Sequence, residues 1–321
     1  MSNNQTKQKT VKASKLYGDY LVMLVAPIAL SVIFYGTRAL AVIAVSVLSA
    51  VLSDLIFSAF LRKNFLLKDL SNVFIGAAIA LMMPAGISLY VPAVASVFAV
   101  ITAKIPFGGS LRAPFVPAAA GFAFATVCFK EQIFDYSYNS ADKLLGNHSL
   151  GSLLTQGNAV YLDTINTFDI LSGNVAGPMG TGCGLLMLAC LVFLAFRRKE
   201  ALFATAGFIA ACVLYAAVFP RINANAFTSV VLELSAGSLL FAAVFLITDY
   251  AALPEKRLTR FVYGAVGGVF CMLMRTVGTY EETVCFAVLL ANGFSPVIDS
   301  VVKKLPSAVK AVPFKRKEAE K

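Results

Sequence analysis

The chain lacks tryptophan, has a single histidine, and carries charge on only 14% of its 321 residues. Soluble globular chains carry Asp, Glu, Lys and Arg at about a quarter of their positions, so this composition argues against a soluble protein. His148 lies in a polar stretch and is expected to be exposed, and the sequence shows no Ser-His-Asp set, metal-ligand cluster or Walker loop. Without tryptophan, any aromatic belt at a membrane interface must come from Tyr and Phe.

The six cysteines do not form a Cys-x-x-C pair. They are Cys128, Cys183, Cys190, Cys212, Cys271 and Cys285. All lie in or at the ends of hydrophobic segments, where the simplest interpretation is a small apolar packing residue. We therefore expect no metal site.

Hydrophobic sequence is abundant, at 59% of residues. It divides into segments of about 15–22 residues joined mostly by short loops, a length suited to crossing a bilayer. The segments are 17–35, 38–60, 71–84, 88–104, 115–129, 181–196, 201–219, 227–247, 260–278 and 283–303. The predicted fold class is all-α, a polytopic membrane protein with about ten transmembrane helices.

The placement of basic residues orients these segments. With the N-terminus in the cytoplasm, only five of the 27 Lys and Arg residues fall outside: Arg38, Lys130, Lys143, Arg221 and Arg275. Cytoplasmic loops carry an excess of Lys and Arg, so both termini are predicted to be cytoplasmic in an inner-membrane protein. The net charge of +10 lies beside apolar segments, which favours contact with lipid head groups and not with nucleic acid.

The chain divides into two halves of five segments each, 17–129 and 181–303. An odd number of crossings in each half predicts an inverted repeat, and in such folds a site often lies between the repeats at broken helices. A polar outer-face loop, 130–180, connects the halves, and basic cytoplasmic tails, 1–16 and 304–321, flank them. This long loop is the first place to look for a site.

Two glycine-containing stretches could carry chemistry. Glycines and prolines interrupt 104–121, which is either a tight turn or a segment that lines a cavity. Residues 171–184 contain five glycines before an apolar segment. Glycine lets backbone N–H groups approach a ligand, and a helix N-terminus favours anions, so a nucleotide or flavin phosphate would fit there. A simple glycine-rich helix entrance is the alternative.

Acidic residues lie within or at the boundaries of the apolar segments. Ionisable groups at depth are costly and often mark ion paths. Asp54, Glu233 and Asp249 are therefore candidates for an ion path, and Asp299 lies near the cytoplasmic boundary. Structural pairing is the alternative for each of them.

Four stretches in order along the chain resemble a known family. They are 104–121, 173–182, 234–249 and 275–292, and 296–299 follows the last of them. Together they resemble the flavin-carrying membrane proteins of ion-translocating redox complexes. The resemblance is to the RnfD protein of the Rnf complex and, more distantly, to the NqrB protein of the sodium-translocating NADH:quinone reductase.

The resemblance implies a flavin mononucleotide (FMN) held as a phosphoester on a threonine of the outer loop, within a motif like D-x-S-G-A-T-P-L. That motif is not intact here. Aligning its downstream tail places Ser149 at the acceptor position, whereas aligning its hydroxyl spacing places Ser152 and Thr155 there. Two asparagines of the family's first-half motif are replaced by Ala113 and Val116. A changed or lost flavin pocket therefore stays open.

The implied function is a membrane component of an Rnf-type ferredoxin:NAD oxidoreductase coupled to Na⁺ or H⁺ movement. The protein would work with the A, B, C, E and G proteins of the Rnf complex, would not be catalytic alone, and could hold a second, non-covalent flavin. The remaining predicted cofactor-binding residues are Gly173, Asn174, Gly177, Gly180 and Thr181. Two rival interpretations are an inverted-repeat channel or permease without redox work, and a scaffold component that has lost its flavin.

Overall fold

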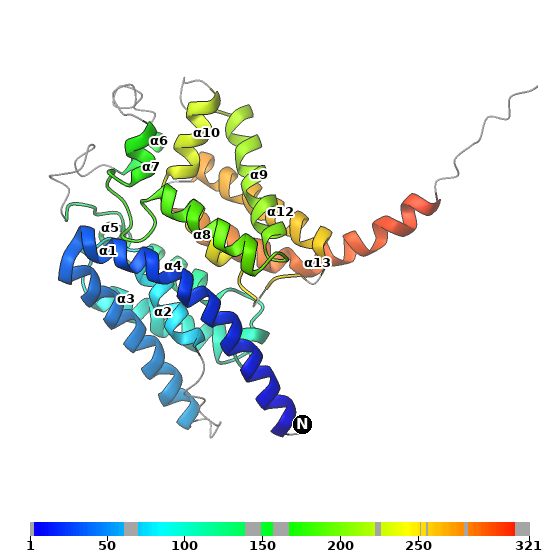
Figure 1. Cartoon of the computed structure of the whole chain (residues 1–321), viewed down its shortest axis with the longest axis horizontal. Helices are drawn as coiled ribbons and strands as arrows, with labels where there is room; N and C mark the ends of the chain where they lie inside the picture. Colours follow the sequence, from blue (N-terminus) through cyan, green and yellow to red (C-terminus); the bar gives the residue numbers. More distant parts are fainter. Residues whose placement is uncertain are drawn as a thin grey trace, which may run out of the picture.

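The computed structural model describes residues 3–60, 70–138, 149–156, 167–221, 226–250, 252–254, 256–278 and 282–311. Within these ranges every regular element is a helix (Figure 1), and the one β-type contact outside them is an isolated parallel bridge between Ser149 and Ala176. The all-α prediction is therefore confirmed for the part of the chain that the structure describes.

The first two apolar segments form α1 (Asn3–Phe60), which is broken at Gly36. The backbone of Gly36 has φ 63° and ψ −147°, so the helix cannot continue through it. Figure 1 shows α1 turning back on itself to give two arms. These arms correspond to the expected segments 17–35 and 38–60, and the first arm also takes in residues 3–16, which the sequence assigned to a tail.

The other segments of the first half are α2 (Ser71–Leu81), α3 (Tyr90–Phe98) and α4 (Pro117–Cys128). The π-helical stretch η1 (Ala99–Lys104) continues α3, and the short 3₁₀ turn η2 (Ser110–Arg112) leads toward α4. Proline at the first position of α4 has no N–H to leave unpaired. α1 packs against α2 and α3, and α3 packs against α4.

The second half contains five segments, the third of which is broken. They are α8 (Gly184–Arg197), α9 (Leu202–Val218), the broken segment α10 (Ala226–Ser235) with α11 (Leu239–Phe241) and the π-helical η5 (Ala242–Leu246), α12 (Arg257–Val277) and α13 (Val284–Ala311). The two parts of the broken segment meet at an angle of 74°. α12 packs against both α9 and α13.

Every one of the ten expected ranges therefore contains helix. By length and hydropathy, three helices among the described residues could cross a membrane: Leu16–Phe60, Arg257–Val277 and Val284–Val302. The bent pair Phe227–Ser235 and Leu239–Leu246 raises the number to four. The count of ten crossings and the inverted relation of the halves stay predictions.

Three short helices belong to the expected outer loop: α5 (Lys130–Ile133), α6 (Leu150–Gln156) and α7 (Thr167–Ser172). α6 and α7 lie beside α10 at one end of the molecule, and the start of α1 lies at the opposite end (Figure 1). His148 and residues 139–147 and 157–166 lie outside the described residues.

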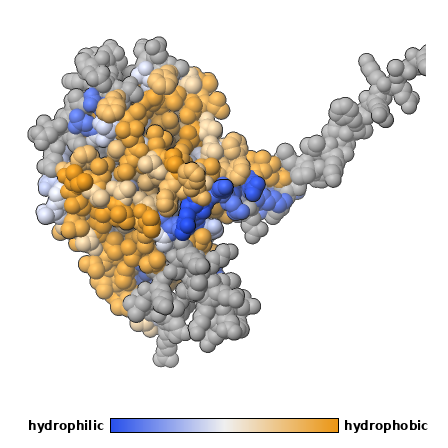
Figure 2. Space-filling model, viewed as in Figure 1, coloured by the Kyte–Doolittle hydropathy of each residue, from blue (hydrophilic) through white to orange (hydrophobic). Residues whose placement is uncertain are grey.

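The two halves share one core. The rings of Tyr17 and Tyr20 from α1 lie 5.5 and 5.1 Å from the ring of Phe74 in α2, and Tyr20 also lies 6.3 Å from Phe245 in η5. Large apolar side chains such as Ile33 and Phe196 are exposed on the outside. Figure 2 shows a broad hydrophobic surface of this kind, which fits contact with lipid.

The break in α1 predicts a specific cost for a side chain at Gly36. No atom lies within 4 Å of the position that a Cβ would take, so only backbone strain opposes Gly36→Ala. We expect this variant to lose about 1–3 kcal/mol of stability, measured by denaturant unfolding in detergent. Gly18→Ala, at a helical position with open space, is the matched control. Equal stability of both variants would contradict the break.

Candidate functional site

The glycine-rich loop begins where α7 ends. Gly173 has φ 86°, and its N–H donates to the carbonyl of Ile170 at 3.3 Å, which is the usual way for glycine to end a helix. A Cβ at this position would lie 3.2 Å from Cys183. The next residue, Asn174, is exposed, and its N–H donates to the carbonyl of Asp169 at 3.1 Å.

The far part of the loop packs against the end of α2. The N–H of Met179 donates to the carbonyl of Met83 at 3.0 Å, and that of Gly180 donates to the carbonyl of Leu81 at 2.9 Å. A Cβ on Gly180 would lie 2.5 Å from the Leu81 side chain, so glycine permits this close approach. Thr181 is buried beside it, and its hydroxyl has no hydrogen-bond partner among the described residues.

Ser149 caps α6. Its Oγ accepts a hydrogen bond from the N–H of Ser152 at 3.0 Å, the standard N-cap geometry. The parallel bridge to Ala176 holds Ser149 beside the glycine-rich loop. Thr155 lies in the last turn of the same helix, and its side chain is outside the described part of the structure.

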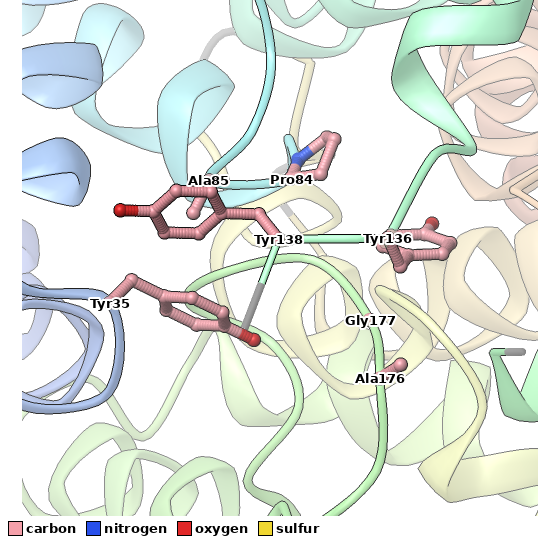
Figure 3. Close-up of a pocket in the computed structure, with 7 residues that line it drawn as sticks. All are labelled: Tyr35, Pro84, Ala85, Tyr136, Tyr138, Ala176 and Gly177. Atoms are coloured by element: carbon pink, nitrogen blue, oxygen red, sulfur yellow. The ribbon is translucent and has the colours of Figure 1, made fainter. Parts of the chain in front are cut away.

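Two small adjoining cavities lie between this loop and its neighbours, and they share Tyr136, Ala176 and Gly177. The first, of about 20 Å³, is lined by both Ser149 and Glu282. The second, of about 10 Å³, is surrounded by the tyrosine rings shown in Figure 3. Each holds about one water molecule. Nothing lies within 4 Å of a Cβ built on Gly177, so the loop is open there.

Figure 3 shows that three tyrosines from two segments surround the second cavity. Tyr35 comes from the end of the first arm of α1, and Tyr136 and Tyr138 follow α5. Their rings, with the loop at Ala176 and Gly177, form an aromatic wall that can accept a flat ring system.

The break between α10 and α11 forms the other side of the first cavity. Arg275 donates from Nη1 to the carbonyl of Glu233 at 2.8 Å and from Nη2 to that of Ala236 at 2.7 Å. Glu282 accepts the N–H of Ser238 at 2.8 Å. A cation therefore meets the C-terminal end of one half-helix and a carboxylate meets the N-terminal end of the next, the arrangement that helix dipoles favour. Gly237, with φ 60°, makes the turn between them.

Glu233 lies in a buried charge cluster. Its carboxylate accepts two hydrogen bonds from Arg221, at 2.5 and 2.8 Å, and lies 3.4 Å from Nη1 of Arg275. The Glu233 and Arg275 side chains are only 3% and 2% exposed. Two guanidinium groups thus compensate the negative charge of one carboxylate, which could not be buried without such partners.

The other acidic candidates lie in separate networks. Oδ2 of Asp54 accepts from Asn72 at 2.8 Å and lies 3.4 Å from Nζ of Lys104, which is also buried. Oδ1 of Asp249 accepts from the hydroxyl of Tyr17 at 3.0 Å. Asp299 is half-buried on α13. Asp54, Glu233 and Asp249 thus do not share one hydrogen-bond network among the described residues.

The structure brings some predicted site residues together and separates others. Ser149 and Gly177 line the same cavity, whereas Gly180 and Thr181 face α2. Sequence reasoning gave no role to Arg221, Arg275 or Glu282, although the last two fall in the fourth resembling stretch. Their signal was a charge at the end of an apolar segment. The described residues hold no cluster of three or more metal-ligating side chains.

Apolar helices, one of them broken beside a polar cavity, define a membrane protein of the kind that uses discontinuous helices to build sites. The chain belongs to the NQR2, RnfD, RnfE family, whose model matches residues 2–307.

Relatives match along most of the chain. The RnfD-type component of Acetobacterium woodii, named for its Na(+)-translocating ferredoxin:NAD(+) oxidoreductase complex, is 24% identical over 89% of this chain and 88% of its own length. The corresponding component of the ion-translocating oxidoreductase complex of Alcanivorax borkumensis is 29% identical over 79% of this chain and 80% of its own. That of Salmonella arizonae is 27% identical, at 87% and 90%.

The charge cluster predicts that Glu233→Gln is destabilising. Loss of the carboxylate leaves two largely buried guanidinium groups without their anion, which costs about 3 kcal/mol or more. Thermal unfolding in detergent should show the loss, and Glu131→Gln, the same change at an exposed position, should leave stability unchanged. Wild-type stability with impaired ion movement would contradict the structural role and favour an ion path through Glu233.

Proposed function

We propose that this chain is a membrane component of an ion-translocating oxidoreductase complex, and that it holds a flavin where the outer loop meets the broken helix. The observation that carries the proposal is that Ser149, Gly177 and Glu282 line one cavity, although they come from three distant parts of the chain. Family membership and the names of the relatives support the complex.

The residues at the cavity suit FMN. The hydroxyl of Ser149 or of Thr155 would form the phosphoester, open space at Gly177 lets the backbone approach the phosphate, and the tyrosine wall would face the ring. The enclosed volume is too small for the ring, which would therefore lie outside it. A bound flavin supplies one- or two-electron transfer, and the protein tunes its potential and position.

The finer assignment follows the family resemblance. The complex would contain the A, B, C, E and G proteins of the Rnf type and would couple electron transfer between ferredoxin and NAD to Na⁺ or H⁺ movement. The name of the Acetobacterium relative specifies Na⁺, whereas the other names specify only an ion. The chain would lie in the inner membrane with both termini in the cytoplasm. A second, non-covalent flavin stays a prediction of the resemblance.

One observation favours the alternative of a scaffold component without covalent flavin. The Oγ of Ser149 already caps α6, and Ser149 is only 6% exposed. A capping role alone explains a serine at this position. A channel or permease without redox work would also lack flavin absorbance when purified.

Covalent attachment is tested by mass spectrometry of the peptide 145–157 from the assembled complex. We expect an added FMN mass that Ser149→Ala abolishes and Thr155→Ala retains, because the sequence after Ser149 resembles the family's downstream tail. In-gel flavin fluorescence should follow the same pattern. An unmodified peptide from wild-type protein would end the covalent hypothesis, and loss in Thr155→Ala alone would move the ester to Thr155.

Flavin contact at the loop is tested by Gly177→Val. The open space at Gly177 lets the added methyl groups project without a clash, so the protein should fold and insert as the wild type does. The same groups would keep a flavin phosphate away from the backbone, so flavin content should fall severalfold. Val175→Ala, a change two residues away that opens no glycine position, is the control for general loop damage. Unchanged flavin content in Gly177→Val would contradict the contact.

A further inference from the structure

A larger cavity of about 230 Å³ lies away from the flavin site. It is bounded by the start of α1, the turn between α8 and α9, and the segment around the start of α12. Its charged lining residues are Asp19, Arg197, Arg198, Lys199, Glu200 and Arg260. We call it the basic cavity.

The two carboxylates of the basic cavity are already engaged. Asp19 pairs with Arg197 at 3.0 Å, and Glu200 pairs with Arg260 at 2.9 Å. The hydrogen bond and the positive charge of Arg260 lower the pKa of Glu200, so this carboxylate stays ionised at neutral pH. Two cations remain, Arg198 and Lys199, and neither has a carboxylate partner in the described ranges.

Arg198 is held in an unusual position. Its guanidinium carbon lies 4.4 Å from the ring centre of Tyr20 and 4.2 Å from that of Tyr250, so aromatic rings contact the group. The residue is 7% exposed, and both terminal nitrogens lack a hydrogen-bond partner among the described residues. A buried guanidinium with unused donors is costly unless an anion meets it. Its charge is also poorly screened by water, so it attracts anions into the cavity.

The surroundings of the basic cavity are apolar. Phe196, Phe203, Leu258 and Phe261 adjoin its lining residues along the chain on α8, α9 and α12, and all four are exposed. Figure 2 shows a hydrophilic band within the largely hydrophobic face, near the point where α13 leaves the body. A ligand with an anionic group and long apolar chains would match both features, whereas a soluble phosphate would use only the first.

We propose that the basic cavity binds the phosphate group of an anionic phospholipid, with Arg198 and Lys199 contacting the phosphate and the exposed apolar side chains contacting the acyl chains. Basic pockets between membrane helices bind such head groups elsewhere. The guanidinium offers a planar pair of donors that matches two phosphate oxygens, and the lysine adds a mobile charge at the entrance.

The test is native mass spectrometry of the purified full-length protein, titrated with phosphatidylglycerol and with phosphatidylcholine of the same chain length. We expect phosphatidylglycerol to bind at least about tenfold more tightly and Arg198→Gln to lower that affinity about tenfold, since a hydrogen-bonded charge is lost. Arg112→Gln, the same change at an exposed arginine that does not line the cavity, should leave the affinity unchanged.

Lys199→Gln guards against a folding defect in Arg198→Gln, because Lys199 is exposed. This variant should bind phosphatidylglycerol severalfold more weakly and unfold at the wild-type temperature. Equal affinity for the two lipids, or wild-type affinity in Lys199→Gln, would overturn the proposal. Displacement of the lipid by glycerol phosphate at equal concentration would overturn the lipid as the source and leave a site for a soluble phosphate ester.

Discussion

The arrangement of the second half depends on how the interrupted backbone between α10 and α11 is satisfied. In an apolar environment each unpaired N–H or carbonyl costs several kcal/mol, so a break is tolerated only where other groups supply the missing hydrogen bonds. Arg275 supplies donors for two carbonyls, and Glu282 accepts an N–H. Both residues flank the connection between α12 and α13, so this one connection holds the two half-helices at their 74° bend.

The same capping residues position the candidate site. The carboxylate of Glu282 would lie 1.6 Å from a Cβ on Gly237, which explains why glycine stands at the break. Glu282 then lines the cavity that Ser149 and Gly177 also line. The flavin site that we propose is thus built on the capped break from one side and on the outer loop from the other. A shift of either half-helix would have to move both.

The extent of the helices could be predicted because hydropathy and length act locally. All ten apolar ranges contain helix, and the boundary expected between 35 and 38 coincides with the break at Gly36. The partners of the buried acids could not be predicted. Arg221 and Arg275 meet Glu233, and Lys104 meets Asp54, across 12 to 50 residues, and such pairings depend on tertiary packing. Two local roles were also hidden: Gly180 serves close packing against Leu81, and Ser149 caps a helix.

The charges at the break bear on how an ion could pass. Arg221 and Arg275 contribute two positive charges, and Glu233 and Glu282 contribute two negative charges, so the group is balanced as it stands. In a region of low dielectric constant, a cation that approached Glu233 would meet two guanidinium groups already bound to it. Binding there would require one arginine to leave, and because Arg275 also caps α10, its departure would expose two carbonyls. An ion path through Glu233 is therefore coupled to opening of the break, whereas the Asp54–Lys104 pair lies in a separate network and carries no such constraint.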